Sequence, residues 1–250
     1  MNPASIATAT VNPVETIVIG PGSFVYRPAG EYLRSGRPID PPVRDVTIRH
    51  QLEIAKYQVS EADYFRCVED AACKAPDNGR SSSGLLPATG VSYLDATAYA
   101  AWFSGQTGEK WRLPTDEEWA YAASERFVDD ALNLPDESAG PAARLLARYR
   151  AESSRERLDP QPRPRGHFGA NSRGLFDIAG NVWEWTTGCY SNSSLSADGT
   201  VAGTSENCGV RIVGGRHRGY MSTFIRDGKS GGCAAGMAPD NLGFRLVRGG

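Results

Sequence analysis

Residues 174–186 have the sequence GLFDIAGNVWEWT, a glycine-containing turn with an acidic residue on each side and two tryptophans at its end. Gly180 permits a sharp turn that can point backbone carbonyl groups inward. Asp177 and Glu184 offer the hard carboxylate oxygens that Ca²⁺ prefers. The stretch therefore indicates either a calcium site or a turn in which two solvated carboxylates lie beside core tryptophans.

The composition of the whole chain is that of a loop-rich globular protein. Of its 250 residues, 28 are glycine and 16 are proline, which is above average usage. Hydrophobic residues make up 40 %, charged residues make up 22 %, and the formal net charge is −2. These values exclude intrinsic disorder and a basic nucleic-acid-binding tail. No apolar run approaches the ~20 residues of a membrane span, so we expect neither a membrane span nor a nucleic-acid partner.

The chain is expected to divide into a lead-in and one domain. We expect residues 1–15 to be a flexible N-terminal lead-in and residues 16–250 to form the domain. Residues 126–166 are charged and rich in Pro and Arg, with a helical Ala-Arg-Leu-Leu-Ala-Arg-Tyr centre, and predict a surface insertion. No linker divides the core.

Three helix starts carry capping signals. Ser60 can cap a helix that runs to about Asp70, and Ser92 can cap a second, Ala-rich helix. Thr115 and Glu118 form the capping box of a third. The sequence thus predicts short helices in the first half of the domain.

Strands are expected on both sides of these helices. Thr16–Tyr26 is typical of a short hairpin or of a strand with a sharp turn. Residues 27–44 predict a surface loop, and residues 46–48 and 52–59 predict strands. Short strands separated by glycines are expected after Gly169.

The five cysteines bound the disulfide pattern. Cys67 and Cys73 lie six positions apart, Cys189 and Cys208 flank a Ser/Gly/Thr-rich stretch, and Cys233 stands alone. None belongs to a Cys-x-x-Cys motif, which argues against a zinc ribbon or a thioredoxin-type pair. Two local loops, each closed by a disulfide, fit the spacings.

The compartment follows from the state of these cysteines. If both pairs are oxidised, the protein is located outside the cytoplasm. The alternative is a cytoplasmic protein with buried free thiols. Residues 1–20 lack a positively charged segment and are interrupted by Pro13, so they show no evident signal peptide.

Four motifs, RLPTDEEWAYAA, GLFDIAGNVWEWT, RIVGG and NLGFRLVR, together resemble the formylglycine-generating enzyme family, also called the sulfatase-modifying factor family. The resemblance runs in order from about Thr16 to Arg248. It implies an α+β fold of the C-type-lectin-like sort, a single compact domain with much irregular structure. It also implies a structural Ca²⁺ site made by the side chains of Asp177 and Glu184 and the carbonyls of Gly180 and Val182.

The resemblance does not extend to the family's oxidation chemistry. Formylglycine-generating enzymes bind copper(I) with two cysteines that follow the Gly-Gly-Ser motif, because copper(I) prefers soft thiolates. Gly219 and Phe224 stand at the corresponding positions here. Formylglycine-generating activity is therefore not expected. The extra helical domain of the family's non-haem-iron branch is also absent.

A finer resemblance is carried by SFVYRPAGEYLRSGRPID, KYQVSEADYFRCV, the insertion over 126–166 and residues 214–246. These segments are similar to NirV-type accessory proteins, which are encoded beside copper nitrite reductase in denitrifying bacteria. Because that reductase is periplasmic, the resemblance agrees with a disulfide-bonded periplasmic protein.

A basic segment replaces the copper cysteines. Its candidate groove residues are Arg216, His217, Arg218, Tyr220, Met221, Arg226, Lys229 and Cys233. Arg and Lys could hold an anion or a peptide, whereas His217 and Met221 could contribute to a copper site. Alternatively, Arg226, Asp227 and Arg245 form buried ion pairs, and Arg216 and Arg218 are solvated.

Two hypotheses for the function follow. The first is an accessory protein without the copper-binding cysteine pair, which serves copper nitrite reductase, or another exported protein or peptide, as a binding or maturation factor. The alternative is a metal-dependent oxidase of the same family, using copper or non-haem iron on a peptide or small molecule.

Overall fold

The computed structural model describes residues 13–77, 84–134, 141–154, 161–228 and 241–249. Its helices are α1 (Glu61–Glu69), α2 (Tyr93–Thr107), α3 (Asp116–Ala123), the 3₁₀ turn η1 (Ser124–Arg126) and α4 (Pro141–Ser154). Its strands are β1 (Thr16–Ile19), β2 (Gly22–Tyr26), β3 (Glu31–Arg34), β4 (Arg37–Ile39), β5 (Arg44–Ile48), β6 (Leu52–Ala55), β7 (Trp111–Arg112), β8 (Trp183–Leu195), β9 (Val201–Gly214), β10 (Arg218–Ser222), β11 (Leu242–Gly243) and β12 (Val247–Arg248).

The predicted helix caps are confirmed. The Ser60 side chain accepts the Asp63 N–H at the start of α1. Ser92 and Thr115 each form a capping box with the acidic residue three positions later, at the starts of α2 and α3. A side-chain oxygen at these positions satisfies backbone N–H groups that have no partner within the helix. Local sequence therefore determines where these helices begin.

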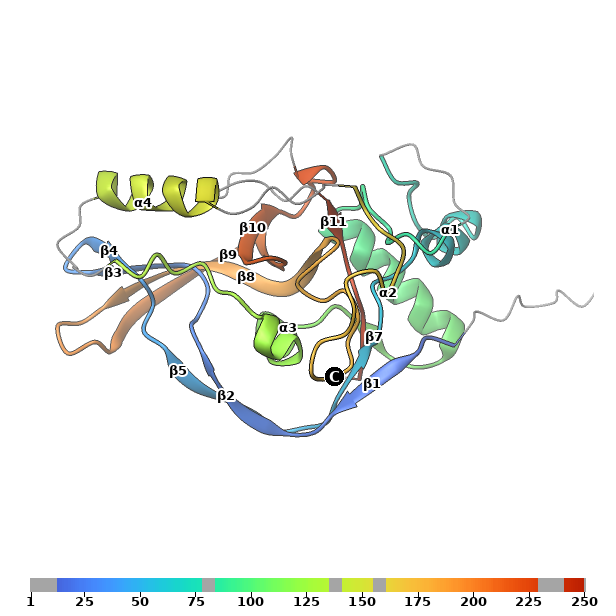
Figure 1. The fold of residues 1–250 in the computed structure, drawn as a ribbon, viewed down its shortest axis with the longest axis horizontal. Helices are drawn as coiled ribbons and strands as arrows, with labels where there is room; N and C mark the ends of the chain where they lie inside the picture. The colour runs from blue at the N-terminus through green and yellow to red at the C-terminus, as the bar shows by residue number, and fades with distance from the viewer. Residues whose placement is uncertain (1–12, 78–83, 135–140, 155–160, 229–240, 250) are drawn as a thin grey trace, which may run out of the picture.

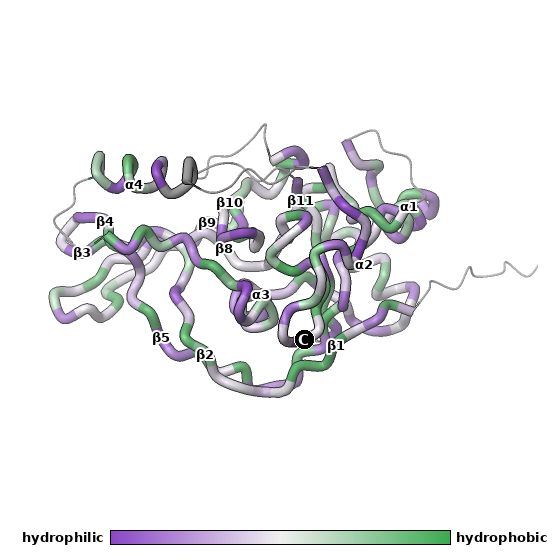
Figure 2. The backbone as a smooth tube through the Cα atoms, viewed as in Figure 1, coloured by the Kyte–Doolittle hydropathy of each residue, from purple (hydrophilic) through white to green (hydrophobic). Residues whose placement is uncertain are grey.

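The strands form three sheets in one α+β domain (Figure 1). One sheet has the order β1-β6-β12-β7, and a second has the order β10-β9-β8-β3-β4, with β11 also paired to β8. The third sheet pairs β2 with β5, and hydrophobic residues alternate with hydrophilic ones along β5 (Figure 2). Strands from both ends of the chain meet in the first two sheets, so the domain closes only when the whole chain is folded.

Several strand predictions were wrong. The loop predicted over 27–44 contains β3 and β4, because β3 pairs in parallel with β8, about 160 residues later in the sequence. The strand predicted over 52–59 ends at Ala55. The short strands predicted after Gly169 include β8 and β9, which have 13 and 14 residues. Of the two alternatives for Thr16–Tyr26, the hairpin is wrong, since β1 pairs with β6 and β2 pairs with β5, and the strand interrupted by a turn at Gly20-Pro21 is confirmed.

The core has two main parts. One surrounds α2 and α1 and includes Tyr64, Tyr99, Trp185 and Phe244, all 0–1 % exposed. The other surrounds Trp119 of α3. Residues 174–186, which lead into β8, contribute to both parts, with Trp183 and Trp185 in the first and Leu175 and Ile178 in the second. This stretch therefore lies at the centre of the fold.

Both predicted disulfides are confirmed. Cys67 is bonded to Cys73 at the end of α1, and Cys189 is bonded to Cys208 across the β8–β9 ribbon. Cys233 lies outside the described residues. Two disulfides are typical of an oxidising compartment.

The insertion predicted over 126–166 contains α4, whose Arg144 pairs with Asp40 at 2.6 Å. Its first residues are tied to β10, because the Val128 carbonyl accepts the Arg218 N–H at 3.0 Å, while the Val128 side chain is 47 % exposed. None of the helices in the described part of the chain has the length and apolar character needed to cross a bilayer.

Candidate functional site

Four oxygens of the 177–184 stretch converge on the side-chain amide of Gln58. Gln58 Nε2 lies 3.4, 3.3 and 3.4 Å from the carbonyl oxygens of Asp177, Gly180 and Val182. The same nitrogen donates to Glu184 Oε1 at 2.8 Å. The fold therefore brings all four predicted ligand residues to one point, which we call the oxygen cage.

The loop that forms the oxygen cage has an unusual backbone. Asp177, Ala179 and Asn181 have φ angles of 59°, 59° and 61°, in the left-handed region that non-glycine residues rarely adopt. Each such residue costs on the order of 1 kcal/mol, and such residues cluster where a backbone geometry is functional. Here the alternation points three carbonyls in one direction.

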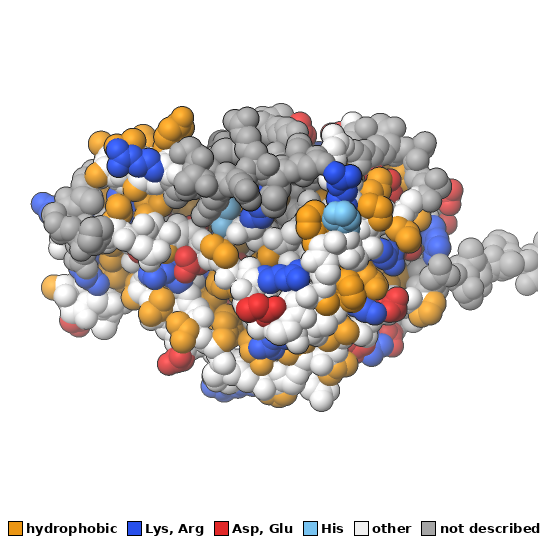
Figure 3. All heavy atoms as spheres, viewed as in Figure 1, with side chains coloured by type: hydrophobic (Ala, Val, Ile, Leu, Met, Phe, Trp, Pro, Cys, Tyr) orange, Lys and Arg blue, Asp and Glu red, His pale blue; other side chains and the backbone are white. Residues whose placement is uncertain are grey.

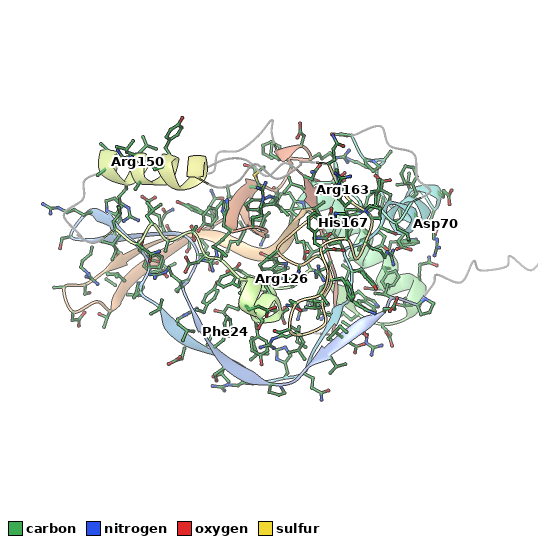
Figure 4. All side chains as sticks on the ribbon, in the orientation of Figure 1. Phe24, Asp70, Arg126, Arg150, Arg163 and His167 are labelled. Atoms are coloured by element: carbon green, nitrogen blue, oxygen red, sulfur yellow. A yellow bond between two sulfur atoms is a disulfide. The ribbon has the colours of Figure 1, made fainter. Side chains whose placement is uncertain are left out.

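Asp177 differs from its predicted role. Its carboxylate accepts the N–H groups of Gly166 and Phe168 at 2.5 and 2.8 Å, so only its carbonyl faces the cage. Arg126 holds the same loop by donating to the Gly169 and Ala170 carbonyls (Figure 4). Hydrogen bonds to the 166–170 segment therefore hold the loop in place, so its shape does not require the Asp177 side chain to bind a metal.

The residues of the oxygen cage fit a cation. The Gln58 amide has two hydrogens for four oxygens, and its own Oε1 is buried with no hydrogen-bond partner among the described residues. Turning this amide over would direct Oε1 to the same point. The cage would then offer only oxygen atoms, the donor set that Ca²⁺ takes.

Glu184 also belongs to a buried ion pair. Its side chain and that of Arg245 are fully buried, and Arg245 donates from Nε and Nη2 to the two carboxylate oxygens at 2.6 and 2.8 Å. Trp119 Nε1 donates to Oε2 at 2.8 Å. The two carboxylates are therefore not solvated, which removes that alternative, and the prediction that Arg245 forms a buried ion pair is confirmed.

Arg218 lies at the centre of a second buried polar cluster. Its guanidinium is 3.2 Å from Asp116 Oδ2 and 3.2 Å from Asp130 Oδ1. Tyr220 donates to Asp130 Oδ2 at 2.6 Å, and Tyr26 donates to Asp116. Burial, followed by the Asp130 charge, raises the pKa of Tyr220 well above its ordinary value, so its hydroxyl stays protonated and donates. We call these five residues the Arg218 cluster.

The predicted basic groove is largely closed. His217, Arg218 and Met221 are 7 %, 2 % and 0 % exposed, so they do not line an open groove, and Arg218 is not solvated. Its positive charge is already compensated by two carboxylates. Met221 of β10 packs in the core around α2, and Tyr220 packs with Ala29 and Ile212. Arg218 pairs with Asp116 of α3, so this part of the basic segment is structural.

The other candidate groove residues are separated. Arg226 forms ion pairs with Asp77 at 2.5 Å and Asp95 at 2.7 Å, which confirms its predicted ion-pair role. Arg216 is half-buried. Lys229 and Cys233 lie outside the described residues. Basic and acidic side chains are interspersed over the coloured part of the face drawn in Figure 3.

Gly219 and Phe224, the residues that the resemblance aligns with the copper cysteines, have different surroundings. A Cβ added at Gly219 would lie 3.1 Å from the Trp183 ring and 3.3 Å from Val213. The His217 ring packs edge-on against Trp183 with ring centroids 4.6 Å apart. Phe224, by contrast, is 70 % exposed. The first position is closed by an aromatic ring, and the second presents an aromatic side chain to solvent.

Four residues of the oxygen cage and the Arg218 cluster were not predicted, namely Gln58, Asp116, Asp130 and Tyr26. Gln58 carries no signal beyond being a polar residue in a hydrophobic stretch. Asp116 resembled an ordinary first-turn acid of α3, and Asp130 an ordinary surface acid of the insertion.

A family model described as the Sulfatase-modifying factor enzyme 1-like domain matches residues 3–249 of the chain. The chain belongs to the sulfatase-modifying factor family. Members of this family often bind Ca²⁺.

Relatives within the sulfatase-modifying factor family include both active and inactive proteins. Inactive C-alpha-formylglycine-generating enzyme 2 of Mus musculus is 30 % identical over 183 residues, which are 69 % of this chain and 52 % of that protein. Formylglycine-generating enzyme of Streptomyces coelicolor is 31 % identical over 199 residues, which are 74 % of this chain and 61 % of that protein. The chain thus spans about half to three fifths of the length of these relatives.

Solved structures support the same fold. PvdO from Pseudomonas aeruginosa superposes with a TM-score of 0.58 at 20 % identity, covering 93 % of each chain. CarF superposes with a TM-score of 0.52 at 19 % identity, covering 94 % of this chain and 98 % of that chain. The sulfatase-modifying factor fold predicted from the motifs is confirmed.

Proposed function

We propose that this member of the sulfatase-modifying factor family is a non-catalytic protein that serves an exported partner as a binding or maturation factor. Copper nitrite reductase, the neighbour of the NirV-type proteins, is the first partner to test, and the periplasm is the proposed compartment. The two disulfides support an oxidising compartment. The mouse relative, named as inactive, is a precedent for a family member without the oxidase activity.

One observation carries this proposal. Gly219 and Phe224, which the resemblance aligns with the two copper-binding cysteines, have no thiolate to offer to copper. Trp183 closes over Gly219, and Phe224 is an exposed aromatic side chain. Aromatic residues, phenylalanine included, are enriched at protein interfaces relative to the rest of the protein surface. The place that holds copper in the enzymes is therefore suited here to contact a partner.

The experiment compares metal content with partner binding. Protein purified without chelator is expected to contain copper and iron far below one equivalent. Immobilised protein is expected to bind copper nitrite reductase, and Phe224→Ala is expected to weaken that binding about tenfold. Val201→Ala, an exposed residue of the ribbon, is the matched control.

Two outcomes would contradict this function. Stoichiometric copper or iron, with oxygen consumption in the presence of a thiol substrate, would favour the oxidase alternative. No binding to the reductase, together with unchanged reductase metallation after deletion of the gene, would exclude the proposed partner.

The oxygen cage is proposed to hold a structural Ca²⁺ ion. The supporting observations are its three convergent carbonyls, the Glu184 carboxylate and the buried, unpartnered Oε1 of Gln58. Because Arg245 compensates the charge of Glu184, the affinity is expected to be modest. Such an ion would tie the loop before β8 to the end of β6 and would take no part in chemistry.

Calcium binding to the native state alone should raise the melting temperature by mass action. We expect the melting temperature to be higher in millimolar CaCl₂ than in EDTA. Gln58→Glu adds a second carboxylate to the cage and should enlarge this calcium-dependent difference. Glu184→Gln should remove most of it. A difference that is unchanged in both variants would place the ion elsewhere, and no difference in the wild type or in Gln58→Glu would exclude a cation in the cage.

A further inference from the structure

A cavity of about 290 Å³ lies beside the start of α1, and Gln58 of the oxygen cage is one of its lining residues. Its walls come from the 13–15 segment, the end of β6 and the residues that follow it, α1, α2, and Arg165. In Figure 4, Asp70 marks the far end of α1 and Arg163 the segment that leads to Arg165. This size lies at the lower end of small-molecule sites. None of the motifs of the family lines this cavity, apart from Leu246.

The cavity combines an apolar surface with charged groups. Val14, Val59, Leu85 and Leu246 contribute apolar side chains. Tyr57 contributes an aromatic ring that the Arg165 guanidinium covers at 5.2 Å. Such a lining favours a ligand with an apolar body and one polar group.

The charges of the cavity leave one cation uncompensated. Asp63 pairs with Arg165 at 3.3 Å, and Glu15 pairs with Lys56 at 2.9 Å. No described residue forms an ion pair or a side-chain hydrogen bond with the guanidinium of Arg66, the remaining charged lining residue. The four charged lining residues sum to zero, and Lys56, which pairs with Glu15 from outside the lining, brings the local charge to about one positive unit, which suits a singly charged anion.

Arg66, Arg165 and Tyr99 line the same cavity. Burial and the Asp63 charge raise the pKa of the Tyr99 hydroxyl, and the charges of Arg66 and Arg165 oppose that rise. Arg165 Nε is buried without an acceptor among the described residues. A buried donor that lacks an acceptor is costly, and a carboxylate is the acceptor that guanidinium groups match best.

We propose that this cavity binds a small organic monocarboxylate, with the carboxylate between Arg66 and Arg165 and the apolar body against Tyr57 and Val59. The site is distinct from the copper position of the family enzymes, and it does not depend on the function proposed above.

Calorimetric titration of the full chain with phenylacetate and hexanoate, at constant ionic strength, tests the proposal. Binding of at least one of these acids is expected, and phenylacetamide, which has the same shape without the charge, should bind at least about tenfold more weakly. Arg66→Gln and Arg165→Gln should each weaken binding of the acid about tenfold. Arg37→Gln, an exposed arginine at the opposite end of the molecule (β4, Figure 1), is the matched control and should change nothing.

A gain of affinity separates recognition from misfolding. Asp63→Asn removes a negative charge and releases Arg165, so it should tighten binding of the acid about threefold or more. Equal binding of acid and amide, no binding of either acid at millimolar concentration, or equal affinity in the two arginine variants and the wild type would each overturn the proposal. All these readouts are independent of metal content and of partner binding.

Discussion

Replacing Arg245 by methionine is expected to lower the free energy of unfolding by about 3–5 kcal/mol, the range found when one partner of a buried ion pair is removed. The side chains of Arg245 and Glu184 have no solvent exposure, and two N–H···O bonds of 2.6 and 2.8 Å join them. Arg245 also donates to the carbonyls of Ala55 and Phe176. The variant would leave the Glu184 carboxylate buried without its cation, next to three carbonyl oxygens.

Urea unfolding followed by tryptophan fluorescence measures this effect. The matched control is Arg248→Met. Arg248 lies three positions after Arg245 and also forms ion pairs, but its side chain is 39 % exposed. Exposed pairs contribute about 0–1 kcal/mol, so the control should lose little. The double variant Glu184→Met/Arg245→Met should recover part of the loss, since it removes the unpaired charge. Equal losses for Arg245→Met and Arg248→Met would show that burial of the pair contributes nothing.

Added calcium provides a second readout of the same pair. If Ca²⁺ occupies the oxygen cage, it supplies the positive charge that Arg245→Met removes. Calcium should therefore stabilise Arg245→Met more than the wild type, measured as the shift of the urea midpoint. This comparison links the ion pair and the cage without reference to any activity.

The helix starts could be predicted because their causes are local. Ser60, Ser92 and Thr115 cap the N–H groups of the next turn, and nothing distant is needed to position them. β3 could not be predicted in the same way. Its four residues are stabilised by parallel pairing with β8 from the far half of the chain, and nothing in Pro- and Gly-rich residues 27–44 indicates that pairing.

The oxygen cage was predicted in part for the same reason. Gly180, Val182 and Glu184 lie within one short motif, so their convergence is a property of the loop. Gln58 lies three residues after the end of β6, and only the tertiary fold brings it to that loop. The roles of Arg218 and Asp130 were likewise invisible, because a charged residue in a Gly- and Arg-rich segment looks solvated until the burial of its strand is known.

Arg218→Met should be as damaging as Arg245→Met, at about 3–5 kcal/mol, because Arg218 is 2 % exposed and faces two carboxylates. It also donates to the Arg27 carbonyl at 2.8 Å, and its guanidinium lies over the rings of Tyr26 and Phe127. Without it, Asp116 is left in the core with only the Tyr26 hydroxyl as a donor from the Arg218 cluster. The cluster joins β10 to α3 and to the start of the insertion, so its loss should loosen all three.

The pH dependence of Arg218→Met distinguishes a lost charge pair from lost packing. Burying a carboxylate without a cation costs more than burying the protonated acid. In the variant, the folded state should therefore hold protons more tightly than the unfolded state, and stability should rise as the pH falls from 7 towards 5. The difference in free energy of unfolding between Arg218→Met and the wild type should become smaller from pH 7 to pH 5. A loss of packing alone would give a difference in free energy of unfolding that does not change with pH. The double variant Asp116→Asn/Arg218→Met should already show this smaller difference in free energy of unfolding at pH 7. Arg218→Lys should lose less free energy of unfolding than Arg218→Met, because lysine keeps the positive charge.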